Sequence, residues 1–193
     1  MKNKKYRIAI FASGGGSNAE QFFKYYKENN WANVSLVLTN KKDAFVIERA
    51  QNYNLPVKIF NREEFYTTDA TIETLKEYNI DIIVLAGFLW KIPDNLIKIF
   101  PEKIINIHPA LLPKYGGKGM YGINVHRAVI AANEKESGIT IHVVNENYDE
   151  GKILSQEKCE VLQNDTPELL AKRVLKLEHE FYPKVVEVLL HNL

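Results

Sequence analysis

An asparagine and a histidine two positions apart are the residues of this chain best suited to chemistry. Asn106 and His108 lie in an apolar run that Pro109 ends. In a β-strand, residues i and i+2 point to the same face, so both side chains should stand together where a buried strand ends. An amide N–H can stabilise an oxyanion, and an imidazole can take or give a proton near neutral pH. The pair therefore indicates acyl-group chemistry, although a histidine at a strand end is often only a satisfied structural residue.

A carboxylate is the usual partner of a histidine base, because its negative charge raises the basicity of the ring. Asp149 is the candidate, and it lies in a segment predicted to form a turn between two strands. A turn-forming aspartate explains this residue equally well, and Glu150 beside it is a second carboxylate. His142, on the preceding strand, is interpreted as a supporting hydrogen-bond partner or a core residue.

The segment from Ser13 to Asn18 reads Ser-Gly-Gly-Gly-Ser-Asn and should form the turn between the first strand and the first helix. Glycines let the backbone approach a ligand closely, and a helix N-terminus favours an anion. The segment predicts a phosphate site, and the alternative is a tight turn with an ordinary helix cap. No P-loop Gly-Lys-Ser/Thr follows, and Thr39-Asn40 replaces the acidic residue that binds a dinucleotide ribose. A small phosphorylated substrate is therefore favoured over NAD.

Apolar stretches of strand length alternate with helical patterns through much of the chain. Strands are expected at 6–12, 33–39, 56–60, 81–86 and 104–108, and helices at 18–29, 43–52, 69–77 and 93–100. After a loop at 111–122 come a helix at 125–133, strands at 139–144 and 153–161, and a helix at 167–190. The apolar stripe predicted for the last helix contains Leu169, Leu170, Val174, Leu177, Phe181, Val185, Val188 and Leu189. The pattern predicts an α/β fold with a mostly parallel sheet, helices on both faces and an antiparallel C-terminal extension.

Length and composition restrict the class of protein. A chain of 193 residues favours a single domain, and a net charge of +1 gives no reason to expect a nucleic-acid partner. No apolar run approaches the roughly 18 residues of a membrane span, and no secretory signal is found. Cys159 is the only cysteine, which fits a reducing, cytoplasmic location. The histidines and this cysteine are widely spaced, so no metal site is predicted.

Together these motifs resemble those of the phosphoribosylglycinamide formyltransferases, folate-dependent enzymes of purine synthesis. The likeness runs along essentially the whole chain, through 13–18, 39–44, 85–88, 106–115, 138–144, 149–151 and 178–179. The Asn-x-His-Pro segment and the later aspartate are shared by several formyltransferases that use the same folate. The Gly-Ser-Asn turn is more specific to the glycinamide ribonucleotide enzyme. The resemblance implies a Rossmann-like sheet in a single formyltransferase domain, 1–193.

The activity implied by the resemblance is transfer of a formyl group from 10-formyltetrahydrofolate, as cosubstrate, to the amine of glycinamide ribonucleotide, with no metal. Catalysis would belong to Asn106, His108 and Asp149. The ribonucleotide-binding residues would be Gly16, Ser17, Asn18, Leu175, Lys176, Leu177 and Glu178. The folate-binding residues would be Arg62, Leu89, Trp90, Lys91, Ile92, Asn106, Asn145, Glu146, Asn147, Tyr148 and Asp149.

Two departures from the family pattern stand out. Trp90-Lys91 stands in the folate segment where relatives often carry other residues, and the glycine-rich loop 116–122 is longer than usual. This loop would either cover the site or lengthen a surface connection. The alternatives are another enzyme of the same folate (a hydrolase or an amino-sugar formyltransferase), a nicotinamide-dependent oxidoreductase, or a phosphosugar-binding module without catalysis. The expected partners are the two small molecules alone, bound by a monomer or homodimer, with no nucleic acid and no membrane.

Overall fold

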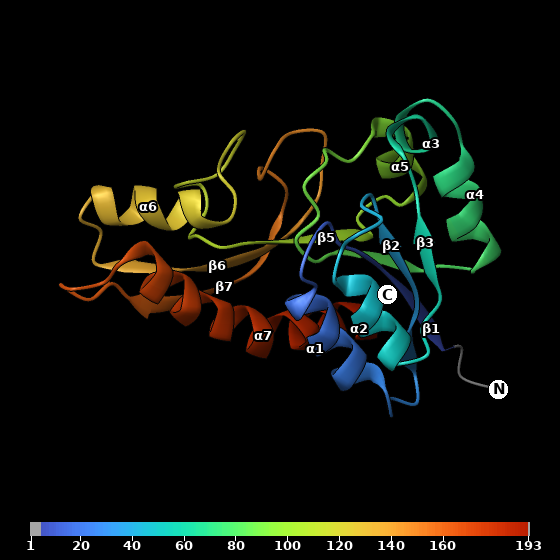
Figure 1. Ribbon diagram of the computed structural model, residues 1–193, viewed down its shortest axis with the longest axis horizontal. Coiled ribbons are helices and arrows are strands. Elements are labelled where there is room, and N and C mark those ends of the chain that lie inside the picture. The colour runs from blue at the N-terminus through green and yellow to red at the C-terminus, as the bar shows by residue number, and fades with distance from the viewer. Residues whose placement is uncertain (1–4, 193) are drawn as a thin grey trace. The chain divides into compact units, whose positions relative to one another are not determined.

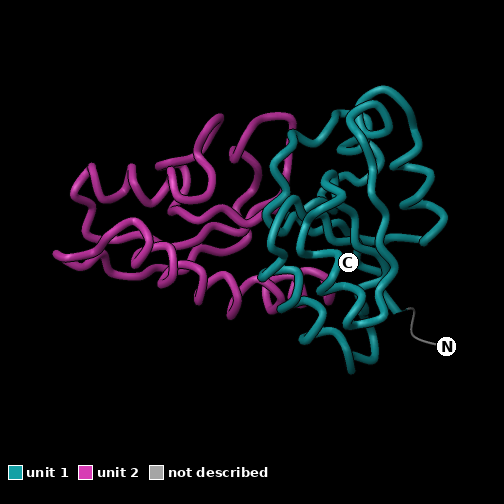
Figure 2. Tube along the Cα trace, viewed as in Figure 1, with its two compact units in different colours: residues 1–105 teal, residues 106–193 magenta. Residues whose placement is uncertain are grey.

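Two compact units make up the computed structural model, which describes residues 5–192. The first unit comprises residues 1–105 and the second residues 106–193 (Figure 2). Each unit carries one group of the residues that the sequence singles out, and each is described in turn.

Parallel strands form the sheet of the first unit. They are β1 (Tyr6–Phe11), β2 (Ala32–Thr39), β3 (Val57–Ile59) and β4 (Ile82–Leu85). β1 pairs with β2 and with β4, and β3 pairs with β2. All four residues of β4, Ile-Ile-Val-Leu, are buried. A strand covered on both faces must be apolar at consecutive positions, which is why the alternation of a half-exposed strand is missing here.

In the described part of the first unit the chain forms five helices. They are α1 (Ser17–Tyr26), α2 (Val46–Asn52), α3 (Arg62–Tyr66), α4 (Ala70–Glu77) and α5 (Asp94–Ile99). α1 buries Ala19, Phe22, Phe23 and Tyr26, which recur at helical spacing. Burying one phenylalanine side chain stabilises the fold by about 1.5–3 kcal/mol. α1 and α2 contact each other and β2, while α3 contacts α4 (Figure 1).

α3 is absent from the sequence-based prediction. Its start is a capping box, in which the Asn61 side chain accepts from the Glu64 N–H at 3.0 Å. The Glu64 carboxylate in turn accepts from the Asn61 N–H at 2.7 Å. These two bonds satisfy N–H groups that a helix start otherwise leaves unpaired. The Asn-x-x-Glu signal is visible in the sequence, but five residues are too few to show a helical period.

An antiparallel pair and two helices characterise the second unit. β5 (Ile104–His108) crosses the boundary and is followed by α6 (Ile123–Ala131), β6 (Glu136–Val143), β7 (Ile153–Glu160) and α7 (Pro167–His191). β6 and β7 are antiparallel, as predicted. A Cβ at Gly138 would lie 2.0 Å from the Glu157 carbonyl oxygen, so β7 can approach only a glycine there. The strand order β3-β2-β1-β4-β5-β6-β7 confirms a mostly parallel sheet with an antiparallel extension.

The buried stripe of α7 differs from the predicted one. Its buried residues are Leu170, Val174, Tyr182, Pro183, Val186 and Leu190. The prediction is wrong for Leu169 and Val188, which are 48% and 62% exposed. Neighbouring apolar residues on this helix fit more than one stripe, and packing against α6, β6 and β7 selects among them. Within residues 5–192, neither α7 nor any other helix has the length and apolar character needed to cross a membrane.

Candidate active site

Four polar side chains meet in the second unit. β5 carries Asn106 and His108, β6 carries His142, and Asp149 lies in the turn between β6 and β7. His108 Nδ1 lies 3.6 Å from one Asp149 carboxylate oxygen, and His142 Nε2 lies 3.6 Å from the other. Asn106 Nδ2 lies 3.2 Å from His142 Nε2. The three residues expected to act together thus form one cluster, in which His142 has the supporting position predicted for it.

His108 is only 4% exposed, and both of its ring nitrogens face polar groups. Nε2 donates to the Tyr115 carbonyl at 2.7 Å, which leaves the lone pair of the neutral ring on Nδ1, toward Asp149. Burial lowers the pKa of His108, and this effect outweighs the Asp149 carboxylate and the Tyr115 carbonyl, which raise it; His142 lowers it further. Asp149 raises the pKa of His108, as predicted, but the larger effect of burial makes the net shift a lowering. The ring is therefore neutral at pH 7, as a base must be.

Asp149 has a left-handed backbone, with φ of 56°. Aspartate tolerates this conformation better than most residues. Its Oδ2 accepts from the Gly117 N–H at 2.9 Å. Burial raises the pKa of Asp149, but the contact with His142, the Gly117 N–H and the positive charge that His108 acquires in acid together bring the pKa below its ordinary value. The carboxylate is therefore ionised at neutral pH.

The hydrogen bonds of His142 indicate its tautomer. Nδ1 lies 3.0 Å from the Val143 carbonyl oxygen, which can only accept, so Nδ1 carries the proton. In the tautomer with the proton on Nδ1, Nε2 accepts from the Asn106 amide. This contact directs the amide nitrogen of Asn106 into the cluster and leaves its second N–H for a ligand oxygen.

Thr140 and Gln156 hold the segment that follows β5, and sequence reasoning did not identify them. The Thr140 hydroxyl donates to the Ala110 carbonyl at 2.7 Å and accepts from the Leu112 N–H at 3.0 Å. Gln156 Nε2 donates to the Thr140 hydroxyl and to the Leu112 carbonyl, each at 2.9 Å. These bonds fasten the start of the loop that supplies the Tyr115 carbonyl. No local motif could reveal them, because the Thr140 partners on the loop lie 28 and 30 positions away.

The glycine turn, residues 13–18, lies in the first unit. Gly16 has φ of 68°, and a Cβ there would lie 2.6 Å from the Val46 Cβ, so glycine is required. No side chain caps α1, although Ser17 and Asn18 occupy its first turn. Within residues 5–192, no hydrogen bond is donated by the backbone N–H groups of Gly14, Gly15, Gly16 and Ser17. Unpaired N–H groups at the positive end of a helix favour a negative charge.

The predicted folate segment 89–92 is attached to this turn within the first unit. The Leu89 N–H donates to the Ser13 hydroxyl at 3.1 Å, and the Leu89 side chain is 53% exposed. Ile92 is buried, so its side chain belongs to the core. Besides its backbone groups, the segment exposes the side chains of Leu89 and Lys91, and Trp90 is half-buried.

Arg62 and Trp90, both predicted to bind folate, lie together in the first unit. The Arg62 guanidinium carbon lies 5.1 Å from the centre of the Tyr66 ring and 5.9 Å from that of Trp90. The Tyr66 hydroxyl donates to the Lys91 carbonyl at 2.9 Å, which fixes its ring beside the predicted segment. The two rings thus hold an exposed cation.

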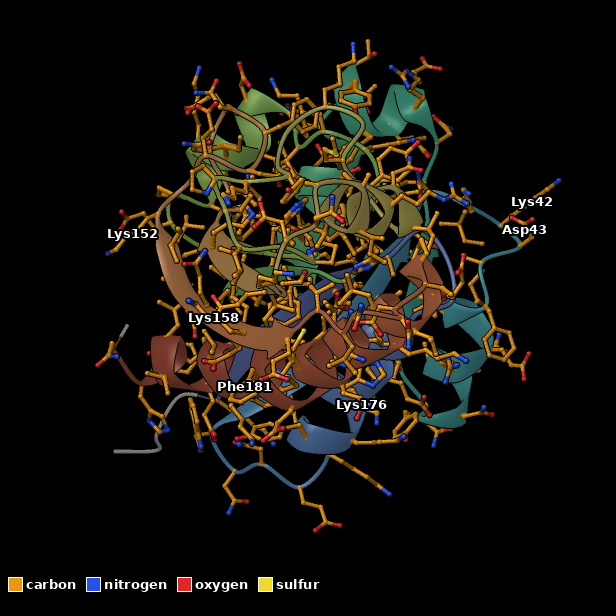
Figure 3. The ribbon with its side chains drawn as sticks, turned by 90° about the vertical axis from the view of Figure 1, so that its left-hand side faces the viewer. Lys42, Asp43, Lys152, Lys158, Lys176 and Phe181 are labelled. Atoms are coloured by element: carbon orange, nitrogen blue, oxygen red, sulfur yellow. The ribbon has the colours of Figure 1, made fainter. Side chains whose placement is uncertain are left out.

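The remaining predicted binding residues lie in the second unit. Residues 145–149 form the turn before β7, where the Asn147 N–H donates to Asn145 Oδ1 at 3.0 Å, and Tyr148 and Glu146 are exposed. Residues 175–178 lie on α7, where Lys176 is exposed and Leu175, Leu177 and Glu178 are half-buried (Figure 3). In the part of the chain that the structure describes, no three His, Cys, Asp or Glu side chains are grouped to hold a metal ion.

Comparison with known proteins assigns the family. The Formyl transferase family profile matches residues 6–186. The chain belongs to the formyl transferase family. The matched range of this formyl transferase includes the glycine turn, the cluster of Asn106, His108 and Asp149, and residues 175–178 of α7.

Several relatives of this formyl transferase are named phosphoribosylglycinamide formyltransferase. The chloroplastic phosphoribosylglycinamide formyltransferase of Arabidopsis thaliana is 44% identical over 95% of this chain, which spans 65% of that protein's length, just under two thirds. The phosphoribosylglycinamide formyltransferase of Bacillus subtilis (strain 168) is 39% identical over 95% of this chain and 94% of its own length. The crystal structure of the Anaplasma phagocytophilum enzyme of that name has a TM-score of 0.89 at 33% identity, covering 98% of this chain and 89% of that one.

Proposed function

We propose that this formyl transferase moves the formyl group of 10-formyltetrahydrofolate to the amine of glycinamide ribonucleotide, a step of purine biosynthesis. The shared name of the Arabidopsis and Bacillus relatives supports the choice of substrates. The observation that carries the proposal is the cluster of Asn106, His108 and Asp149. An amide donor, a neutral imidazole and an ionised carboxylate are the groups that direct acyl transfer to an amine needs.

The cosubstrate supplies the formyl group, and the chain supplies charge stabilisation and proton transfer. The free N–H of the Asn106 amide donates to the formyl oxygen as attack by the amine makes it negative. His108 takes the proton of the attacking amine, because burial keeps its ring neutral. The resulting imidazolium is stabilised by Asp149 on the Nδ1 side and by the Tyr115 carbonyl on Nε2. A water held by Asp149 relays the proton to the departing folate nitrogen as the bond between that nitrogen and the formyl carbon breaks.

The glycine turn is the proposed site of the ribonucleotide phosphate, through Gly16, Ser17 and Asn18. Its unpaired N–H groups and the N-terminus of α1 support this role. The ribose hydroxyls are assigned to Glu178, with 175–177 beside it on α7.

The folate is assigned to 89–92 and 145–149, with Arg62 at its glutamate tail. The exposed Leu89 side chain and the backbone groups beside it suit a flat heterocycle. The Arg62 guanidinium has no carboxylate partner among residues 5–192 and suits an anionic tail. A single domain, a monomer or homodimer and a cytoplasmic location stay predictions, and the plant relatives are named chloroplastic.

Absorbance of the deformylated folate product tests the proposal. Purified protein and 10-formyltetrahydrofolate are mixed with and without glycinamide ribonucleotide. We expect product only when the amine is present. Product formed equally without the amine would indicate hydrolysis of the folate, and no product in either mixture would refute formyl transfer.

A further inference from the structure

Hydrogen bonds inside the first unit hold all three glycine carbonyls of the turn. The Gly14 carbonyl accepts from the Val46 N–H at 3.1 Å, and the Gly16 carbonyl accepts from the Glu20 N–H at 2.9 Å. The Gly15 carbonyl accepts from the Arg49 Nε–H at 2.8 Å. Two of these three donors belong to α2. An anion is repelled by carbonyl oxygens and attracted by N–H groups, so the direction of each peptide decides whether the turn can bind a phosphate.

Peptide planarity links these bonds to the unpaired donors. In a trans peptide, the carbonyl of one residue and the N–H of the next point in opposite directions. Holding the Gly14 and Gly15 carbonyls toward α2 therefore directs the N–H groups of Gly15 and Gly16 away from it. These N–H groups are among those that donate no hydrogen bond within residues 5–192. α2 thus sets which side of the turn carries the donors.

Arg49 provides the side-chain bond of this set, and its guanidinium is held from several sides. Nη1 forms an ion pair with Glu20 of α1. The guanidinium carbon lies 5.0 Å from the centre of the Phe45 ring. Glu20 also lies 3.5 Å from Lys24, an exposed cation one helical turn away that does not touch the glycine turn. The charge of Arg49 is therefore compensated locally, and its direct bond to the turn is the contact with Gly15.

We propose that Arg49 is a positioning residue for the substrate phosphate, acting by fixing the Gly15–Gly16 peptide so that its N–H faces the phosphomonoester. The identity of that substrate rests on the proposed function. Arg49 acts through the backbone and does not take part in proton transfer. Its loss should therefore weaken binding of the phosphorylated substrate and leave the chemical step intact.

Steady-state kinetics of Arg49→Met test this role. Methionine keeps an unbranched apolar stem beside Phe45 but donates no hydrogen bond. The KM for glycinamide ribonucleotide should rise about tenfold, the effect of losing roughly one charge-assisted hydrogen bond. The kcat and the KM for 10-formyltetrahydrofolate should stay within about twofold of wild type, because the phosphate is bound equally in the ground state and in the transition state. A fall in kcat together with a rise in both KM values would show a merely structural role and overturn the proposal.

Two further variants separate the hydrogen bond from the charge. Lys24→Met removes the other cation beside Glu20 and should leave all three constants at their wild-type values. Arg49→Gln places an amide N–H donor where Nε lies but carries no charge, so its KM for the ribonucleotide should stay near that of wild type. A KM as high as that of Arg49→Met would mean that the charge matters and not the hydrogen bond, and would contradict the proposal. Arg49→Gln also keeps the test decisive if Arg49→Met fails to fold.

Titration with inorganic phosphate, followed by ¹H–¹⁵N spectra, separates this inference from the proposed function. Phosphate should shift the amide signals of Gly14–Ser17 in wild-type protein, at concentrations about tenfold lower than in Arg49→Met. If this difference is found but wild-type protein transfers no formyl group, the proposed function fails and the role of Arg49 stands. If wild-type protein transfers the formyl group and both proteins bind phosphate equally, the role of Arg49 fails alone.

Discussion

The glycine turn of the first unit and the polar cluster of the second use hydrogen bonds in opposite ways. In the turn, the protein holds the carbonyl groups and leaves a row of N–H groups unpaired. In the cluster, each chemically active side chain is already bonded: His108 to Tyr115, Asp149 to Gly117, and Asn106 to His142. Unpaired donors bind an anion, whereas a bonded cluster fixes tautomers and pKa values. Binding of the phosphate should therefore depend on the direction of the peptides in the glycine turn. The rate of formyl transfer should depend on the protonation states of the side chains in the cluster.

The largest effect should come from the cluster. His108→Ala removes the proposed base, so kcat should fall about a thousandfold, within the range for loss of general acid–base catalysis. The KM for glycinamide ribonucleotide should change little, because the phosphate site lies in the other unit. Steady-state assays on a variant with wild-type thermal stability check this. A near-normal kcat would remove His108 from the mechanism. A large rise in KM would show that the cluster also contributes to ribonucleotide binding, contrary to the roles assigned to the two regions.

Asp149→Asn should lower kcat about a hundredfold, because the amide keeps an oxygen for the Gly117 N–H but no longer stabilises an imidazolium. Glu150→Gln is the matched control, since it changes the neighbouring carboxylate, whose side-chain hydrogen bond within residues 5–192 comes from Asn147 alone. Its kcat should equal that of wild type. Equal losses in both variants would show that the charge of the turn matters, not the position of Asp149.

The pH profile sharpens the account of the cluster. Because burial lowers the pKa of His108, wild-type kcat/KM should be flat above pH 6.5 and fall below it, as the ring takes up a proton. Asp149 raises that pKa, so Asp149→Asn should move the acid limb to lower pH. Protonation of His108 also affects stability. Below its ordinary pKa of 6.5, the ring takes up a proton in the unfolded chain, whereas the buried ring resists protonation. The free energy of unfolding should therefore decrease as the pH falls below 6.5. An acid limb that moves to higher pH in Asp149→Asn would contradict this arrangement.

In the glycine turn, Gly16→Ala should reduce the unfolding free energy by about 1–3 kcal/mol, the cost of a left-handed backbone for a residue with a side chain. It should also raise the KM for the ribonucleotide, because the new Cβ displaces Val46 or the turn. Gly14→Ala is the control, since a Cβ there meets nothing within 4 Å. Thermal unfolding and KM should separate the two variants. Equal thermal stability and equal KM in the two variants would mean that the turn is a simple connection between β1 and α1 and not a binding site.

The smallest effect should come from the support of the cluster. Thr140→Val leaves the Ala110 carbonyl and the Leu112 N–H without their partner and should reduce the unfolding free energy by about 1–2 kcal/mol. Thr74→Val removes only a bond from a helical hydroxyl to the Ala70 carbonyl and should change it by less than about 0.5 kcal/mol. Urea unfolding measures both. A loss no larger than that of Thr74→Val would show that Thr140 does not hold the loop.

Sequence reasoning predicts the sheet and most helices of this chain, because buried parallel strands such as Ile82–Leu85 read as unbroken apolar runs. It misses α3, which is too short to show a helical period, and it wrongly places Leu169 and Val188 on the buried stripe of α7, where packing decides. The Asn106–His108 pair follows from strand alternation alone. Its convergence with Asp149 is a geometric fact that only the folded chain supplies.

The undetected residues share one physical cause. Arg49, Thr140 and Gln156 act through hydrogen bonds to backbone groups 34, 30 and 44 positions away. Such bonds need only one donor or acceptor side chain, so no residue pattern marks them. The net effect of burial on the pKa of His108 is hidden for the same reason, since it depends on what surrounds the ring.

A ¹³C label on the formyl carbon shows where this protein transfers the group. Labelled 10-formyltetrahydrofolate is incubated with the protein and glycinamide ribonucleotide, and the carbon signal is followed by NMR. We expect that the label leaves the folate and appears in the formamide of the ribonucleotide, quickly with wild-type protein and about a thousandfold more slowly with His108→Ala. Label that appears as free formate, or that stays on the folate, would contradict this expectation.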